Sequence, residues 1–249
     1  MQPHAPVVDI DALSDHIEQA LASPATTHGL ARALRALAKE VTLYRHHRAG
    51  ERANPDGRTD HKPRRVQIGG GGHRITGFHN IDIVPPADLL WDVREGIPLH
   101  DDSVETLFSE HFLEHIDYPR SAKHYAREAH RVLAPGGRII TGVPDAAYVL
   151  NHYPAPPEQA AEMIERWYSK RDCLGDINTY LDLINYVFRD QDDDPTYTPH
   201  LWAYDHEKLV SLFTEAGFTS VEPWPFDPTM ANPKRRWASV YVVARKPGA

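Results

Sequence analysis

Apolar residues near the N-terminus recur at intervals of three and four positions, which is the period of an amphipathic helix. The residues of this stripe are Leu30, Leu34, Leu37, Val41 and Tyr44. Thr26 or Thr27 is placed to cap the helix, and a shorter helix capped by Asp9 or Asp11 precedes it. The polar stretch 45–64 then predicts a linker. We expect residues 1–64 to form an N-terminal helical extension whose apolar stripe contacts the domain or a second subunit.

From residue 65 onward, short apolar runs alternate with turns and helical patterns. The runs that predict strands are 65–68, 80–83, 87–90, 104–109, 138–143, 219–224 and 237–244. Helical spacing is found over 118–133 and over 205–216. This alternation predicts an α/β domain with a mostly parallel sheet, helices on both faces and ligands at the carboxyl ends of the strands.

Residues 144–199 interrupt the alternation. They contain two helical patterns, 157–170 and 179–188, followed by the acidic run 190–194. We expect a helical lid insertion of about residues 145–199 within a domain that spans 65–249. The lid is rich in aromatic side chains, including Trp167, and Trp202 follows it. Such rings suit the C–H faces of a sugar, although they are equally suited to the core of a small helical cap.

Composition narrows the classes of protein. Hydrophobic residues make up 41% and charged residues 25%, as in ordinary globular domains. A net charge of -8 disfavours nucleic acid as the main partner, and no apolar run is long enough for a membrane span. The single cysteine, Cys173, allows no internal disulfide. With an acidic N-terminus unlike a signal peptide, we expect a cytoplasmic protein.

Four consecutive glycines, residues 69–72, lie between the first two predicted strands. A flexible loop is the simple alternative. At a strand end, however, the backbone of Gly69, Gly70 and Gly71 can approach a nucleoside, and Asp82 ten residues later can accept from ribose hydroxyls. The dinucleotide pattern G-x-G-x-x-G fails here, since the sixth position from Gly69 is Arg74, and this disfavours a nicotinamide or flavin cofactor.

An ordered set of short motifs resembles the class I S-adenosylmethionine-dependent methyltransferases. The motifs are residues 66–71, Asp82, Asp92 with Val93, 108–115, 131–138 and 216–218. The resemblance covers roughly residues 65–143 and 200–245 and implies a Rossmann-like sheet with S-adenosylmethionine as cofactor. The stretch between Gly72 and Asp82 is too short for the usual first helix. That feature resembles the small branch associated with sugar and polysaccharide biosynthesis, and more narrowly an actinobacterial O-methyltransferase that caps methylmannose polysaccharides.

The resemblance also implies roles for individual residues. Gly69, Gly70 and Gly71 would let the backbone approach the cofactor, and Asp82 would bind its ribose. Asp92 and the adjacent Val93 would face the adenine. The methionine portion would be bordered by Ser109, Glu110 or His111. Gln67 replaces the acid that is usual at the third position of the first motif, so an amide or a water would hold the amino-acid end.

A hydroxyl acceptor must lose a proton on methylation, and histidine accepts protons well near neutral pH. His200 and His152 are the leading candidates for the base, with Asp145 as the orienting acid and His111 as a further candidate. His115 also lies near the expected site, unless it only packs beside Leu113. His152, in turn, is equally consistent with an exposed loop position.

The spacing of His111 and His115 leaves a metal site open. Four positions apart on a helix, both imidazoles would lie on one face, and Asp145 or His152 could complete a site. Two histidines at this spacing also recur by chance. Magnesium is open as well, but its ligands are mostly oxygens and the sequence designates no such cage.

These observations predict an S-adenosylmethionine-dependent O-methyltransferase that acts on a hydroxyl of a small carbohydrate or glycoside with histidine-assisted deprotonation. One alternative is an N- or O-methyltransferase for a small aromatic or other secondary metabolite. The other, raised by Gln67, is a methyltransferase-like binding subunit without catalysis. The apolar stripe of residues 30–44 predicts a homodimer, and we expect neither a nucleic acid nor a membrane as partner.

Overall fold

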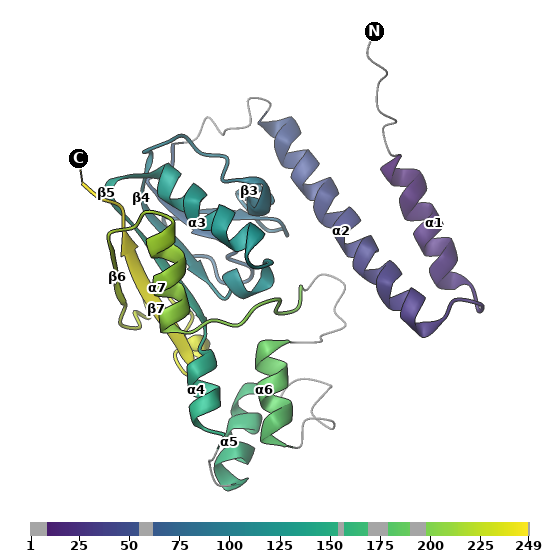
Figure 1. Cartoon of the computed structure of the whole chain (residues 1–249). Helices are drawn as coiled ribbons and strands as arrows, with labels where there is room; N and C mark the ends of the chain where they lie inside the picture. The colour runs from purple at the N-terminus through teal and green to yellow at the C-terminus, as the bar shows by residue number, and fades with distance from the viewer. Residues whose placement is uncertain (1–8, 55–61, 154–156, 169–178, 190–197, 249) are drawn as a thin grey trace.

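Seven strands form a single sheet in the order β3-β2-β1-β4-β5-β7-β6 (Figure 1). The computed structural model describes residues 9–54, 62–153, 157–168, 179–189 and 198–248. The strands are β1 Arg65–Ile68, β2 His79–Asp82, β3 Leu89–Leu90, β4 Val104–Glu110, β5 Leu133–Pro144, β6 Ser220–Pro223 and β7 Ser239–Arg245. Strands β1 to β5 are parallel, and β7 runs antiparallel to both β5 and β6. The carboxyl ends of β1, β2, β4 and β5 therefore meet at one edge. The Rossmann-like α/β sheet expected from the sequence is confirmed.

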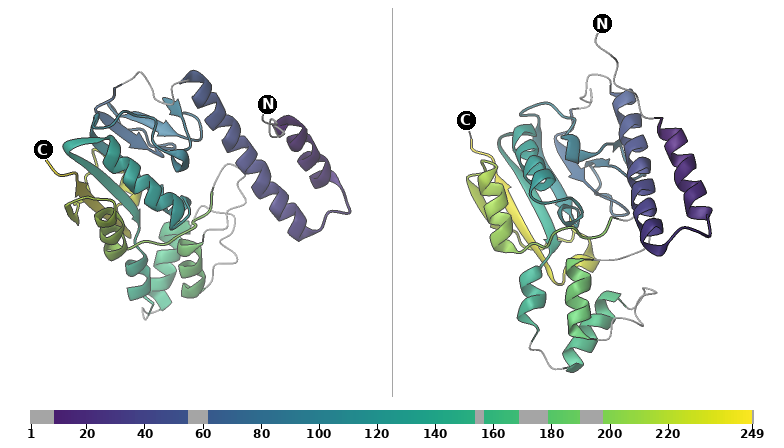
Figure 2. Two further views of the ribbon diagram at one scale, coloured as in Figure 1. Left: turned by 45° about the horizontal axis from the view of Figure 1, so that its top comes forward. Right: turned by 45° about the vertical axis from the view of Figure 1, so that its right-hand side comes forward.

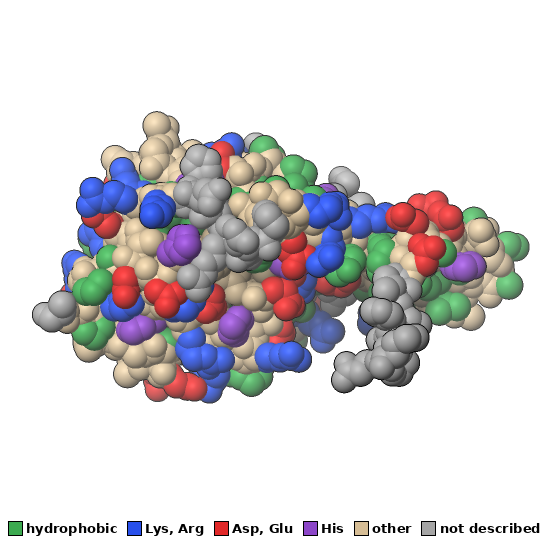
Figure 3. Space-filling view, turned by 90° about the horizontal axis from the view of Figure 1, so that it is seen from above, with side chains coloured by type: hydrophobic (Ala, Val, Ile, Leu, Met, Phe, Trp, Pro, Cys, Tyr) green, Lys and Arg blue, Asp and Glu red, His purple; other side chains and the backbone are tan. Residues whose placement is uncertain are grey.

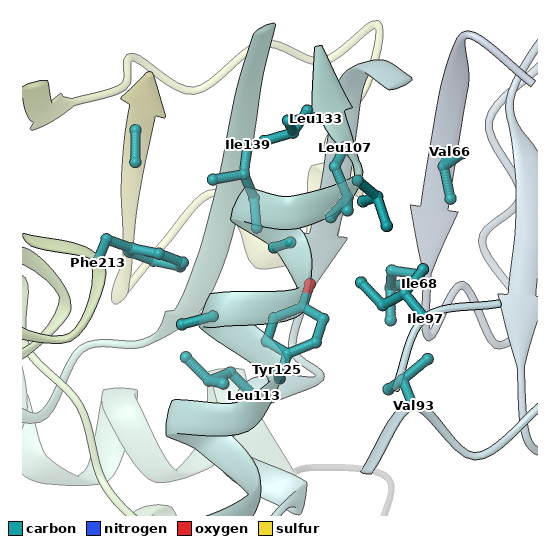
Figure 4. Packing of buried hydrophobic residues seen from close by; sticks show 14 of the residues in the cluster. Val66, Ile68, Val93, Ile97, Leu107, Leu113, Tyr125, Leu133, Ile139 and Phe213 are labelled. Atoms are coloured by element: carbon teal, nitrogen blue, oxygen red, sulfur yellow. The ribbon is translucent and has the colours of Figure 1, made fainter. Parts of the chain in front are cut away.

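One face of the sheet is covered by α3 Arg120–Val132 and α7 His206–Glu215 (Figure 1). Helix α3 buries residues at helical spacing, and its largest buried side chain is Tyr125. Figure 4 shows the Tyr125 ring between Leu113 and the strands, close to Leu107. Its ring also packs edge-on against Phe112 at 5.2 Å between centroids. This cluster fixes the turn after β4, which carries several residues of the site.

In the described part of the chain, turn segments pack against the opposite face of the sheet. Phe108, Ile140 and Val243 on this face pack against residues of the segments 75–78 and 224–231. The physical reason is the short connection from β1 to β2, whose residues are all described and form turns with no helix. The sequence had indicated that this connection is too short for a helix.

The N-terminal segment forms two helices, α1 Ile10–Ala22 and α2 His28–Ala53, beside the β3 edge of the sheet (Figure 2). Asp9 and Thr27 cap them, as predicted. Residues 45–53 of the expected linker belong instead to α2, which continues to Ala53. Its last turns pack on β3, where a Cβ at Gly50 would overlap the carbonyl of Leu90. Seen from above, the helix pair projects from the main body, and side chains of both charges are interspersed over this face (Figure 3).

Three helices lie beyond the carboxyl end of β5 (Figure 1): α4 Ala146–Asn151, α5 Pro157–Tyr168 and α6 Tyr180–Phe188. They share a small core that includes Val149, Met163 and Leu183. Helix α4 was not predicted. Trp202 is half-exposed and stacks on Tyr118 at 4.8 Å, so it does not form the core of this cap.

Two features discussed from the sequence, Cys173 and the acidic run 190–194, lie outside the described residues. Short 3-10 turns complete the architecture: η1 Val93–Glu95, η2 Leu113–His115 and η4 Pro233–Arg235. None of the helices in the described part of the chain has the length and apolar content needed to cross a membrane.

Candidate functional site

A cavity of about 930 Å³ lies at the carboxyl ends of the parallel strands. Its walls come from the glycine turn 69–72, the segments 81–86 and 91–94, the turn after β4, α6, the segment 198–200 and the C-terminal segment 232–239. This is the place where open parallel sheets bind ligands, and the volume suits a cofactor together with a small acceptor.

The glycine turn is held in shape by the buried side chain of Gln67. Its amide nitrogen donates to the carbonyl of His73 at 2.7 Å, and its amide oxygen accepts from the backbone N–H of Ile75 at 3.0 Å. Both ends of the amide are therefore engaged with the loop. The expectation that this amide holds the amino-acid end of a cofactor is not supported by this geometry.

Two of the glycines are required by contacts below the turn. Gly69 has a φ of +66°, and a Cβ there would lie 2.7 Å from the ring of Phe112. A Cβ at Gly70 would lie 2.5 Å from the side-chain oxygen of Asn80, which accepts from the N–H of Gly70. Gly71 and Gly72, in contrast, have no atom within 4 Å of such a Cβ and line the cavity. The turn thus presents bare backbone to a ligand.

Asp82 connects this turn to the end of β2. One carboxylate oxygen accepts from the N–H of Gly71 at 2.9 Å, and the other accepts from the N–H of Val84 at 3.1 Å. The side chain also lines the cavity. Because each carboxylate oxygen can accept more than one hydrogen bond, Asp82 retains capacity for ligand hydroxyls.

Asp92 lies on the cavity wall next to Val93, but a cation already engages its carboxylate. The guanidinium of Arg94 donates to it at 2.7 and 2.9 Å and also reaches Glu40 of α2 at 2.9 Å. These hydrogen bonds raise the pKa of Arg94 above its ordinary value. To contact adenine, Asp92 would have to use the hydrogen-bond acceptor sites of its carboxylate that Arg94 does not occupy.

Helix α2 supplies a wall of the cavity that sequence reasoning did not anticipate. Leu43 is 6% exposed and lines the cavity. The ring of His46 bonds to the carbonyl of Ile83 at 2.8 Å, and the ring of His47 accepts from the N–H of Asp92 at 3.2 Å. The available signal was the pair of histidines directly after the apolar stripe, in a stretch interpreted as linker.

Two residues expected beside the cofactor do not line the cavity. Ser109 is fully buried, and its hydroxyl pairs with that of Thr141 at 3.1 Å within the sheet. The buried carboxylate of Glu110 binds the hydroxyl of Tyr241 at 2.7 Å and Nη1 of Arg235 at 3.2 Å. Both predictions are corrected, because successive side chains of a strand point to opposite faces of the sheet and each of these two is engaged by neighbouring protein groups there. Glu110 instead anchors the C-terminal segment that walls the cavity.

His111, the last residue expected there, does line the cavity. It directly follows β4 with a φ of +50°, and its Nε2 lies 2.8 Å from the hydroxyl of Ser239, which also lines the cavity. Burial lowers the pKa of His111 well below its ordinary value, and the positive charges of Arg235 and nearby histidines add to the effect. The charged form of this imidazole is therefore disfavoured.

An unanticipated acid, Glu114, lies among the histidines. It is 2% exposed, with Nδ1 of His111 at 3.6 Å and Nε2 of His115 at 3.9 Å from one of its oxygens. Neither carboxylate oxygen has a hydrogen-bond partner among the described residues. Burial raises the pKa of Glu114. The sequence did not single out this acid, because only the histidines on either side of it have a recognisable ligand spacing.

His115 and His200 approach each other from distant parts of the chain. Their ring centroids are 4.9 Å apart, and both residues line the cavity. Nδ1 of His115 bonds to the carbonyl of Thr198 at 2.5 Å, and Nδ1 of His200 to that of Val187 at 2.7 Å. Burial lowers the pKa of His115 to about 3. The imidazoles of His115 and His200 thus lie next to the buried acid.

The remaining predicted catalytic residues lie elsewhere. Asp145 caps α4 by accepting from the N–H of Ala147, and His152 bonds to the carbonyl of Tyr148 and stacks on its ring. Neither lines the cavity. The metal set that combined His111 and His115 with Asp145 or His152 is therefore wrong, since His111 lies in the turn after β4 and His115 in the 3-10 turn η2, so the two do not share a helix face. Within the described part of the chain, the grouping capable of holding a metal is Glu114, His115 and His200.

Comparison with known proteins gives one family match. Residues 85–141 match the family model of a methyltransferase domain. No curated relative matches the sequence. The matched segment runs from the turn before β3 into β5. It includes the turn after β4, which carries His111, Glu114 and His115. On a sheet with this strand order, the match makes residues 85–141 similar to a methyltransferase domain.

The solved structures to which the chain is similar are distant. A Thermotoga maritima S-adenosylmethionine-dependent methyltransferase is 16% identical, with 86% of this chain and 97% of that chain covered and a TM-score of 0.43. One from Methanosarcina mazei is 14% identical over 74% and 92% of the two chains, with a TM-score of 0.44. One from Mesorhizobium loti is 15% identical over 74% and 90%, with a TM-score of 0.41.

Proposed function

We propose that this protein transfers the methyl group of S-adenosylmethionine to a hydroxyl of a small carbohydrate or glycoside. The donor fits the glycine end of the cavity, because Gly71 and Gly72 present bare backbone there and Asp82 keeps acceptor capacity. Val93 and Leu43 supply apolar contact for a planar base on the same wall. When bound, the cofactor supplies an electrophilic methyl group on a sulfonium centre.

The observation that carries the acceptor class is the lining at the other end of the same cavity. Tyr186 and Trp237 bring aromatic rings, while Thr198, His111 and Ser239 bring hydrogen-bonding groups. A sugar needs this combination, because its C–H faces pack on rings and its hydroxyls require polar partners. The continuity of the cavity supports placing donor and acceptor in one space, where alignment alone lowers the barrier to transfer.

For deprotonation we assign Nε2 of His111. It lies beside the hydroxyl of Ser239 on the cavity wall, so the pair can take up the acceptor proton. His200, which the sequence favoured, has Nδ1 on the carbonyl of Val187 and its ring against His115. Leu43 and the aromatic rings of the lining exclude water from the reacting groups.

Two measurements test the proposal in sequence. First, S-adenosylhomocysteine should raise the melting temperature of the full chain. Second, the protein should transfer labelled methyl groups from S-adenosylmethionine to members of a panel of sugars and glycosides, and not to phenols or aromatic amines. Methylation of the aromatic acceptors alone would reject the carbohydrate assignment. No stabilisation and no transfer would favour a binding subunit without catalysis.

The base is tested with His111→Ala and the matched control His152→Ala. His111→Ala should lower kcat by about 100-fold or more, the usual contribution of a positioned base, while the affinity for S-adenosylhomocysteine is preserved. His152→Ala should leave kcat within about twofold, since the side chain lies outside the cavity. Full turnover by His111→Ala would remove it as the base.

A homodimer through α2 stays part of the proposal. Leu30, Leu37 and Tyr44 are 50%, 42% and 47% exposed and stand seven residues apart on one face of the helix. This spacing is typical of helices that pair along an apolar seam. Light scattering should give twice the mass of the chain, and a monomer mass would reject the dimer.

A further inference from the structure

The buried carboxylate of Glu114 is the least satisfied group of the site. It is 2% exposed, and neither of its oxygens has a hydrogen-bond partner among the described residues. A buried carboxylate in that condition is costly unless a cation, a proton or a water completes its environment. The geometry around it indicates which of these completes it.

The two neighbouring histidines are oriented as metal ligands are. Each places Nδ1 on a backbone carbonyl, that of Thr198 for His115 and that of Val187 for His200. These contacts make Nδ1 the protonated nitrogen, so the lone pair of each ring is on Nε2. A metal-binding histidine is usually supported in this way, by a carbonyl that accepts from the ring nitrogen not bound to the metal and so fixes the tautomer.

The ligand atoms are also close enough to share one ion. One oxygen of Glu114 and one ring nitrogen each of His115 and His200 lie within 4.8 Å of one another. Nε2 of His115 is 3.9 Å from the carboxylate, and the rings of His115 and His200 meet edge-on with their centroids 4.9 Å apart. Bringing ligand atoms to bonding distance from an ion requires only side-chain adjustments of this order, because tetrahedral metal–nitrogen bonds are about 2.1 Å long.

We propose that Glu114, His115 and His200 bind a divalent first-row transition cation, with zinc as the reference ion. Two imidazoles and one carboxylate suit such ions, whereas magnesium prefers an all-oxygen set. His115 and His200 both line the cavity, so the remaining coordination positions face the acceptor end. There the ion would bind an oxygen of the acceptor or a water.

The rival occupant is a single water. A second, small cavity of about 10 Å³ lies against Glu114, His200 and Tyr204, and the hydroxyl of Tyr204 also has no partner among the described residues. That volume is at the lower limit for one water. A water there would serve Glu114 and Tyr204, but it would give His115 and His200 no shared role. Metal binding separates the two explanations.

The test measures metal binding by the full chain without any methyl transfer. After chelation and dialysis, the protein is titrated with cobalt(II), followed by visible absorption, and with zinc(II), followed by calorimetry. We expect one ion per chain, visible bands of a low-symmetry cobalt site, and no comparable binding of magnesium. The proposal is overturned if cobalt or zinc does not bind, or if magnesium binds equally well.

Variants locate the ion. His115→Ala and His200→Ala should each weaken cobalt binding by at least about 100-fold, beyond the 10- to 100-fold typical of second-shell changes. His152→Ala, a histidine outside the cluster, should bind as the wild type does. Binding unchanged in both cluster variants would assign the ion to surface histidines and overturn the proposal.

If a cluster variant does not fold, X-ray absorption at the zinc edge of the wild-type protein gives the same decision. Two imidazoles and a carboxylate oxygen around zinc are expected, and a different ligand set overturns the assignment. Both readouts are independent of the acceptor. A site that binds zinc while no sugar is methylated would reject the proposed function and leave the metal site standing.

Discussion

The two ends of the cavity are built in different ways. At the donor end, Gln67, Asn80 and Asp82 are each hydrogen-bonded to nearby backbone, and all lie within sixteen residues of one another. At the acceptor end, Glu114 has no hydrogen-bond partner among the described residues, and His115 meets a histidine from far along the chain. The donor end is therefore preformed by local structure, whereas the acceptor end depends on the folding of distant segments and on what binds there.

The largest expected effect concerns the donor end. Gly69→Ala places a side chain at a φ of +66° and 2.7 Å from Phe112, so it should destabilise the fold by about 2–4 kcal/mol and abolish binding of S-adenosylhomocysteine. Gly72→Ala, in the same turn but with open space around its Cβ, should cost less than about 1 kcal/mol. Urea unfolding and calorimetry measure both quantities. Equal stability of the two variants would show that the turn is not preformed.

The second effect compares two buried acids four residues apart. Glu110→Gln should cost about 2–3 kcal/mol, because the carboxylate accepts from Arg235, Tyr241 and the N–H of Asn232. Glu114→Gln in metal-free protein should change stability by less than about 0.5 kcal/mol, since no hydrogen bond is lost. Thermal and urea unfolding in the presence of a chelator test the pair. If Glu110→Gln is as stable as the wild type and binds S-adenosylhomocysteine poorly, the result would support the prediction from the sequence that Glu110 borders the methionine portion of the cofactor.

The smallest effect concerns the wall that α2 contributes. Leu43→Ala removes apolar contact from the cavity and should weaken binding of S-adenosylhomocysteine by about 1 kcal/mol, or about fivefold. The exposed Leu37 on the same helix is the control, and Leu37→Ala should leave this affinity unchanged. Calorimetry distinguishes them. Equal affinities would mean that α2 does not contact the donor.

Much of the fold could be predicted from the sequence, because its signals are local. Each strand is a short apolar run followed by a turn, and the caps Asp9 and Thr27 mark their helices directly. The extension of α2 to Ala53 was missed for a physical reason. Its last turns carry His46, His47 and Gly50, which read as polar or as a helix breaker but pack against β2 and β3.

The donor end and the acceptor end of the site also differ in how well the sequence predicts them. The residues of the glycine turn and Asp82 were predicted and line the cavity, since they are adjacent in the chain and in space. Asp145 and His152 were also predicted as site residues from the sequence. In the structure, Asp145 accepts from the N–H of Ala147 and His152 bonds to the carbonyl of Tyr148, both in α4. The pairing of His115 with His200 depends on how the segment after α6 returns to the sheet. No pattern in the sequence specifies that return.

Because α2 supplies part of the cavity wall, the sheet domain alone does not contain the whole binding surface. A fragment that starts at residue 65 would keep all seven strands but lose Leu43 and the contact of His47 with Asp92. Affinity for the donor is then thermodynamically linked to the docking of the helix pair. A ligand that touches Leu43 favours the docked state, and any mutation that loosens α2 lowers the apparent affinity by the fraction of molecules left undocked.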